Sequence, residues 1–204
     1  AARPAAAHAK HGAPDYPLVA PHPFDPAAAR RELRLAGFDA EAGTALRVVL
    51  LMPQGSEPLR RIADLFGAAC QRAGVVLEVR ACEFAVLLDE RREGRWDGLL
   101  AWQTFDAWGD PHRFLHSQGL DNFGGWQHPE ADLLAAAAQA ELDSQRRHAT
   151  WRELHLLAHR EQPAALLVHP MVTMLLNADV VDAEPGPLGL SLERAWVPAH
   201  AHRR

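Results

Sequence analysis

Cysteine is scarce in this sequence, and the little there is leaves the redox compartment undecided. Cys70 and Cys82 are the only 2 cysteines among 204 residues. Cys70 falls on the apolar face of an expected helix and Cys82 in an expected strand, so we expect both to be small buried apolar side chains. A disulfide would require Cα atoms closer than about 7 Å, and the sequence leaves that pairing open.

Long apolar runs are also missing. None reaches the roughly 18 residues that a membrane-spanning helix requires. The Ala-rich start lacks the continuous apolar core of a signal peptide. We therefore expect the chain as given to be soluble, and a longer precursor remains open.

An excess of basic residues is lacking as well. The chain has 21 Lys and Arg against 26 Asp and Glu, a formal net charge of −5. Nucleic-acid-binding surfaces are typically basic, so we expect no nucleic-acid partner. The negative charge fits a weak preference for cationic or amine-bearing ligands.

Signature motifs of common enzyme classes do not occur. The sequence has no His-Glu-x-x-His and no Gly-x-Ser-x-Gly, and Gln54–Pro58 lacks the lysine of a phosphate loop. The pairs His112/His116 and His155/His159 are spaced to share a helix face, but no cysteine cluster accompanies them. We expect no metal, no cofactor and no catalysis. A small hydrolase or metal enzyme is the alternative from another class.

Strand-like and helix-like segments alternate in the middle of the chain. Apolar runs predict strands at residues 46–52, 75–82 and 96–103. Between them, helical spacing and caps predict helices at 56–74 and 84–94. This order implies a predominantly parallel α/β sheet with right-handed crossovers.

The flanking segments complete the expected organisation. Residues 1–24 are rich in Ala, Pro and His without a period, which favours a linker or a loosely attached, extended arm. Residues 25–198 are expected to form one α/β lobe, and 199–204 a tail. The further elements expected are helices at 25–37, 110–117, 129–142 and 143–160, a strand at 164–176 and a loop at 184–189.

Aromatic and acidic residues gather after the third expected strand. Trp102, Trp108 and Trp126 share this segment with Asp106 and Asp110, among turn-forming glycines and prolines. Aromatics and carboxylates on a loop at a strand's end are typical of ligand-binding sites. The segment therefore indicates a binding protein rather than an enzyme.

Several motifs occur in the order found in one known family. They are Phe24-Asp-Pro through Ala-Gly-Phe38, the unit from Leu46 to Glu83, Gly94-Arg-Trp-Asp-Gly through Trp102, Asp110-Pro-His-Arg-Phe-Leu115, Asn122 to Asp132, Arg146-Arg147 with Trp151, and Glu161-Gln-Pro163. On these motifs, residues 12–198 resemble the C-terminal part of the family 5 extracytoplasmic solute-binding proteins of ABC importers. Dipeptide-, oligopeptide- and nickel-binding proteins form this group.

The resemblance implies a fold and a function. The fold would be a periplasmic-binding-protein-like lobe, with a mainly parallel or mixed sheet flanked by helices. The chain would be part of the substrate-binding component of an importer, periplasmic or otherwise extracytoplasmic, that holds peptides or similar solutes between two lobes and docks on a membrane permease. Full members are considerably longer, so the exposed cleft face is a candidate for homodimerisation. A ligand-sensing domain of a regulator would share the fold, and ligand identity stays open.

The resemblance also implies where the ligand binds. In peptide-binding members a tryptophan at the end of this strand lines the pocket, and Trp102 matches it. An aspartate holds the peptide's α-ammonium by a charge-assisted hydrogen bond, and Asp106 is its nearest match, slightly further from Asp110 than in the family. The expected ligand contacts are Trp102, Gln103, Thr104, Asp106 and Trp108.

These residues also have structural alternatives. Trp102 is open to a core role, Trp108 to plugging the loop against the sheet, and Asp106 to a solvated or helix-capping role. The structural roles expected beside them are an N-cap for Asp110, a turn for Asn122 and packing for Phe123.

Overall fold

The computed structural model describes residues 2–5, 7, 9, 13–103, 109–170, 175–186 and 189–199. The chain forms two compact units. One, the sheet unit, is His22–Thr104, and the other, the helical unit, combines Ala1–Pro21 with Phe105–Arg204. Each unit is described below by itself.

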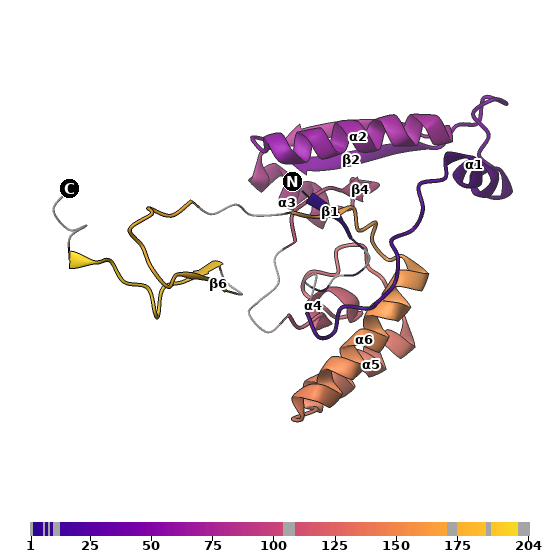
Figure 1. Cartoon of the computed structure of the whole chain (residues 1–204). Coiled ribbons are helices and arrows are strands. Elements are labelled where there is room, and N and C mark those ends of the chain that lie inside the picture. Colours follow the sequence, from indigo (N-terminus) through magenta and orange to yellow (C-terminus); the bar gives the residue numbers. More distant parts are fainter. Residues whose placement is uncertain are drawn as a thin grey trace. The chain divides into compact units, whose positions relative to one another are not determined.

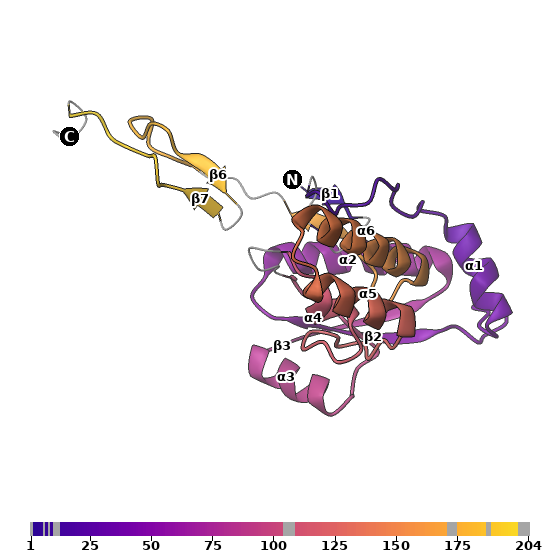
Figure 2. The same cartoon turned by 90° about the horizontal axis from the view of Figure 1, so that it is seen from below.

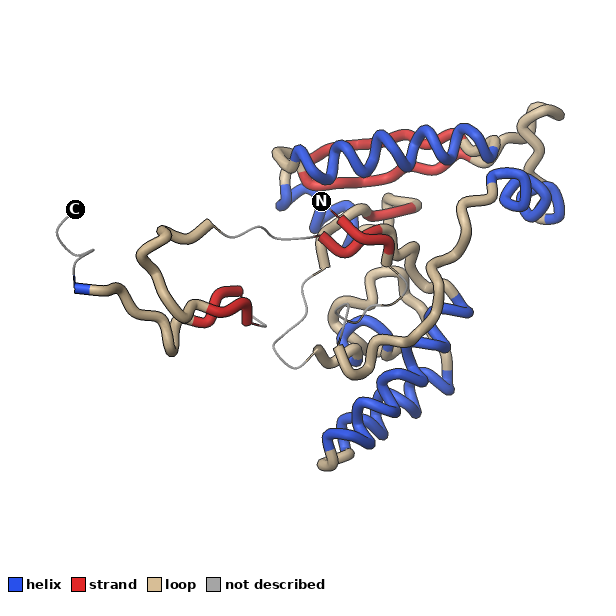
Figure 3. Tube along the Cα trace, viewed as in Figure 1, coloured by secondary structure: helices blue, strands red, loops and turns tan. Residues whose placement is uncertain are grey.

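Three parallel strands form the centre of the sheet unit (Figures 1 and 3). They are β2 (Arg47–Pro53), β3 (Val76–Cys82) and β4 (Gly98–Leu99), in the order β3-β2-β4. The central strand β2 is almost wholly aliphatic, as a strand covered on both faces requires. The predicted parallel α/β arrangement is thus confirmed.

Helix α2 (Glu57–Ala73) lies along the sheet (Figure 1). Ser56 begins it by accepting a hydrogen bond from the Leu59 amide at 3.4 Å, and Gly74 ends it in the left-handed region at φ 87°. Its apolar face buries Leu59 and Ala63 against Met52 of β2. The cap and stop signals therefore place this helix where the sequence predicts it.

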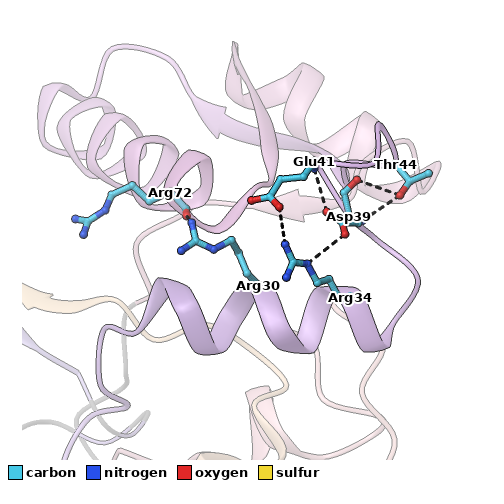
Figure 4. Close-up of polar contacts among 6 residues, drawn as sticks. All are labelled: Arg30, Arg34, Asp39, Glu41, Thr44 and Arg72. Carbon is cyan, nitrogen blue, oxygen red and sulfur yellow. Dashed lines mark hydrogen bonds and ion pairs between the residues drawn. The ribbon is translucent and has the colours of Figure 1, made fainter.

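Helix α1 (Pro26–Leu35) begins at Asp25, whose carboxylate accepts from the Ala28 amide at 2.9 Å. Figure 4 shows two arginines of α1 reaching neighbouring segments. Arg30 donates to the Arg72 carbonyl at 2.8 Å, and Arg34 contacts the carboxylates of Asp39 at 3.2 Å and Glu41 at 2.9 Å. These contacts are solvent-exposed, so each contributes at most about 1 kcal/mol.

The third strand is much shorter than the sequence predicts. Residues 96–103 form an apolar run, but only Gly98–Leu99 pair as β4. The Asp97 carboxylate accepts a hydrogen bond from the Val49 amide at 2.8 Å. A side chain thus replaces the backbone carbonyl that would accept this bond in a regular strand pair. Beyond Leu99, one further bond joins the Leu100 amide to the Leu51 carbonyl at 2.8 Å. Helix α3 (Phe84–Arg92) precedes this strand, as expected.

An antiparallel helix pair forms the core of the helical unit (Figure 2). Helix α5 (Pro129–Ala140) and helix α6 (Ser144–Glu161) follow each other closely, and the Asp143 carboxylate caps α6 through the Arg146 amide at 2.9 Å. The short helix α4 (His112–Leu115) packs beside them. The buried core residues are Leu115, Ala131, Ala135, Leu154, Leu157 and Ala158.

The N-terminal arm is packed along the helical unit. Strand β1 (Ala2–Pro4) pairs antiparallel with β5 (Val168–Pro170). Further along, Asp15 is only 4% exposed, and Pro17 is fully buried. Residues 2–4 are thus held by a short strand pair, and Asp15 and Pro17 by burial, whereas Leu18 is fully exposed. Only Val168–Pro170 of the strand expected at 164–176 is a strand in the structure, and residues 171–174 lie outside the described part.

The prediction of a loop at Glu184–Gly189 is wrong for the described residues. Its ends belong to an antiparallel pair, β6 (Glu184–Gly186) and β7 (Gly189–Ser191). Residues 184–186 and 189–191 are therefore strands, and residues 187–188 between them lie outside the described part. Across the helices described, none is long and apolar enough to cross a membrane.

Gly119 lies where the chain folds back after α4. Its amide donates to the His116 carbonyl at 2.9 Å, and the Asp121 amide donates to the Arg113 carbonyl at 2.9 Å. A Cβ at position 119 would collide with the backbone carbonyls of His112 and Arg113, which cannot rotate away. Gly119→Ala is therefore expected to lower the free energy of unfolding by about 1–3 kcal/mol in urea denaturation.

Gly124 provides the matched control in the same segment. A Cβ there would meet its nearest atom, the Pro163 carbonyl oxygen, at an ordinary 3.7 Å. Gly124→Ala should change the free energy of unfolding by no more than about 0.5 kcal/mol. Equal losses in the two variants would contradict the steric explanation.

Candidate ligand-binding site

The strand order marks one edge of the sheet as the place for a ligand. The chain steps from β2 to β3 on one side and then crosses back to β4 on the other. Strands β2 and β4 are neighbours, and the chain leaves them toward opposite sides of the sheet. In open α/β sheets, ligands generally bind beyond the carboxyl ends of the strands at such a reversal point.

The segments that follow β2, β3 and β4 all begin at this carboxyl edge. The loop after β2 is tied to the end of β3 because the Gln54 amide donates to the Cys82 carbonyl at 2.9 Å. Gly55, at φ 81°, turns the chain toward Ser56, so the amino end of α2 also points to this edge. The segment that leaves β4 after Leu99 is the third. Backbone donors and loop side chains are thus concentrated here.

Two of the five expected ligand contacts lie on this third segment. Trp102 is 43% exposed, and Gln103 is exposed. This exposure leaves the indole accessible to a ligand, and the role of Trp102 stays a prediction. Thr104, Asp106 and Trp108 lie outside the described residues, and their roles stay predictions.

Asp110 and Asn122, which follow this segment, are structural. The Asp110 carboxylate accepts from the His112 amide at 2.9 Å and from the Gln139 side chain at 3.2 Å. It holds the turn before α4, but the N-cap of this helix is Pro111, so the predicted N-cap position is wrong by one residue. The Asn122 side chain donates to the Trp126 carbonyl at 2.7 Å and accepts from the Trp126 amide at 3.0 Å. This confirms its turn role. Phe123 is 37% exposed and packs less closely than expected.

The first histidine pair forms a ring stack rather than a chelating pair. The rings of His112 and His116 are 4.4 Å apart and nearly parallel, and His116 Nδ1 lies 3.9 Å from the Asp132 carboxylate. Partial burial and the neighbouring His116 lower the pKa of His112. Among the residues that the structure describes, no three His, Cys, Asp or Glu side chains form a group able to hold a metal ion.

Both cysteine thiols are free and half-buried. Burial raises the pKa of the Cys70 thiol, and burial together with the Glu90 carboxylate raises that of Cys82. A raised pKa leaves less of the nucleophilic thiolate at neutral pH. Neither thiol is therefore prepared for covalent chemistry.

Two hollows lie near the other edge of the sheet, where α2 ends. One, of about 340 Å³, is lined by Phe24, Asp25, Pro26, Ala27, Arg30 and Arg72. The other, of about 200 Å³, lies between α1 and the end of α2. Arg72 stacks over the Phe24 ring at 5.0 Å. Sequence reasoning did not identify them, because they depend on how α1 meets α2.

Comparison with known proteins assigns a family. Residues 1–125 match the family described as bacterial extracellular solute-binding proteins, family 5 Middle. The chain is 24% identical over 171 residues to di/tripeptide-binding protein 3 of Pseudomonas aeruginosa, covering 81% of this chain and 32% of that protein. It is 22% identical over 178 residues to the dipeptide-binding protein of Escherichia coli, covering 84% and 33%.

Solved structures agree on the fold. The structure of HbpA2 from Haemophilus parasuis superposes with a TM-score of 0.76 at 20% identity, over 89% of this chain and 37% of that one. The predicted periplasmic-binding-protein-like α/β fold is thus confirmed. The chain spans about a third of the length of the curated relatives it matches. The matched family of solute-binding proteins is the one that the sequence motifs predict.

Proposed function

Because this chain belongs to the bacterial extracellular solute-binding proteins of family 5, we propose that it contributes one wall of a cleft that holds a peptide or another amine-bearing solute. The half-exposed Trp102, on the segment that leaves the carboxyl end of β4, carries this proposal. An aromatic face at a sheet's carboxyl edge offers apolar area to a ligand side chain, and loop amides offer polar contacts. The relatives named as di- and tripeptide-binding proteins support the ligand class.

Binding would couple to closure rather than to a chemical step. In this proposal the ligand bridges this lobe and a second lobe of the intact protein, as the resemblance to the family implies. A ligand that makes contacts only in a closed arrangement shifts the population toward that arrangement. In this proposal Trp102 and Gln103 form part of the wall, with Thr104 and Trp108 beside them. In the same proposal, the Asp106 carboxylate accepts a hydrogen bond from the α-ammonium of the peptide.

The same proposal places the protein outside the cytoplasm. There it would deliver solute to an ABC permease in the membrane, and it would need no nucleic acid, metal or cofactor. The homodimer expected through the exposed cleft face stays a prediction. Light scattering across a concentration series would reveal it as a mass that doubles.

Peptide titration tests the proposed function. Di- and tripeptides should bind in titration calorimetry, and Trp102→Ala should weaken their affinity about tenfold or more, because stacked aromatic area contributes roughly 1.5 kcal/mol. Trp196→Ala is the control, since that indole is also exposed, at 52%, but lies in the other unit and donates to Asp182 at 3.1 Å. It should leave affinity unchanged.

The ammonium contact can be tested separately. Acetylating the peptide's amino group should abolish most of the affinity for the native chain. In Asp106→Asn, free and acetylated peptides should bind about equally, because the charged acceptor is gone. No binding of any peptide, together with turnover of ester or peptide substrates, would contradict the proposed function and favour the hydrolase alternative.

A further inference from the structure

Asp15 is a buried acidic residue in the N-terminal arm. Its Oδ2 atom lies 3.1 Å from Nε2 of His155 in α6, and its Oδ1 atom lies 3.7 Å from Nδ1 of His148, two turns earlier on the same helix. Asp15 is 4% exposed and His155 is fully buried. A carboxylate is costly to bury unless a donor or a positive charge faces it. Contacts with these two histidines therefore offset the cost of burying the Asp15 carboxylate.

The neighbours of Asp15 reinforce this attachment. Arg152 of α6 donates to the Pro14 carbonyl. The Tyr16 ring meets His169 of β5 edge-on at a centroid distance of 5.8 Å. Pro17 is fully buried, whereas Leu18 directly after it is fully exposed. Attachment of the arm to the helical unit therefore stops sharply after residue 17.

Asp15 lies shortly before the first connection between the two units. The chain leaves the helical unit and enters the sheet unit at His22, seven residues after Asp15. We propose that Asp15 is a latch that fixes the N-terminal arm on α6 and so sets where the first connection between the two units begins. Opening the latch would free residues 13–17 from α6 and lengthen that connection.

The charge state of Asp15 determines how the stability of the latch changes with pH. Burial raises the pKa of the Asp15 carboxyl, but the hydrogen bond and charge of His155, with His148 adding to them, hold it below its ordinary value of 3.8. The latched state therefore binds a proton less readily than the released state. Its stabilisation is fully present above pH 3.8 and is lost as pH falls through the lowered pKa. The charged and titratable groups around Asp15 are His148, His155 and Arg152 of α6, with His169 beside Tyr16.

Hydrogen–deuterium exchange of the full chain tests the latch. Peptides covering residues 13–21 would be followed by mass spectrometry at neutral pH. Asp15→Asn keeps an acceptor oxygen but removes the charge, so exchange in this segment should accelerate about tenfold or more. Asp143→Asn is the control, because it removes the same charge from the exposed N-cap of α6, where asparagine caps equally well. It should leave arm exchange unchanged.

The pH profile of the native chain needs no variant. After correction for the intrinsic exchange rate, protection of residues 13–17 should hold from neutral pH down to the ordinary aspartate range and then fall. The Asp15→Asn profile should show no such step. A native profile that stays flat to about pH 2.5, or equal arm protection in Asp15→Asn and the native chain, would overturn the latch.

Discussion

Leu154→Ala should be among the most damaging single substitutions in this chain, lowering the free energy of unfolding by about 2–5 kcal/mol. The Leu154 side chain is fully buried at the centre of the helical unit, where α6 packs on α5. Truncation removes buried apolar area and leaves a cavity between two helices that cannot close around it. Urea denaturation followed by tryptophan fluorescence measures the loss, because Trp126 packs against the same core.

The control for this truncation lies on the partner helix. Leu133 of α5 is 73% exposed, so Leu133→Ala removes the same atoms from a position that buries little. Its effect should stay within about 0.5 kcal/mol. A loss at Leu133 comparable with that at Leu154 would mean that the apolar core does not lie between these helices.

Leu59→Ala should have an effect of the same size in the sheet unit. Leu59 is 1% exposed on the first turn of α2, and it packs with Met52 and Ala63 between the helix and the sheet. We expect a loss of about 2–5 kcal/mol. The Leu59 amide also closes the N-cap bond to Ser56. Since alanine retains that amide, the loss reports side-chain packing alone.

Leu65 serves as the control on the same helix. It is 74% exposed, so Leu65→Ala keeps the helix and changes only solvated surface. Circular dichroism in a urea series should find Leu65→Ala close to the native chain and Leu59→Ala well below it. If both variants lost equal stability, helix propensity rather than burial would explain the effect.

Helix boundaries followed from the sequence because their causes are local. The Asp25 and Ser56 caps and the glycine at position 74 act within one turn of their own backbone. The parallel sheet also followed, since strands alternating with helices leave few other solutions. The family could be proposed from motif order, and comparison confirmed it.

Strand length and pairing were less accessible, because they depend on a distant partner. An apolar run at 96–103 does not reveal that only Gly98–Leu99 form a strand beside β2. The turn composition near residue 186 does not reveal that the two sides pair as a hairpin. The candidate site was partly accessible for the same reason. Its tryptophan could be named from the sequence, whereas its place near the carboxyl ends of the neighbouring strands β2 and β4 follows from the strand order.

The sequence by itself determined the local structure of this protein and its family membership. These are the capped helices, the alternation of strands and helices, and the family of solute-binding proteins. What only the tertiary structure decided is which distant residues meet. Asp15 in an arm without any period is separated from His155 by 140 residues, and only the folded chain brings them within 3.1 Å. Capping and periodicity act through neighbouring backbone groups, while burial and ion pairing act through space, so one-dimensional patterns carry the first and not the second.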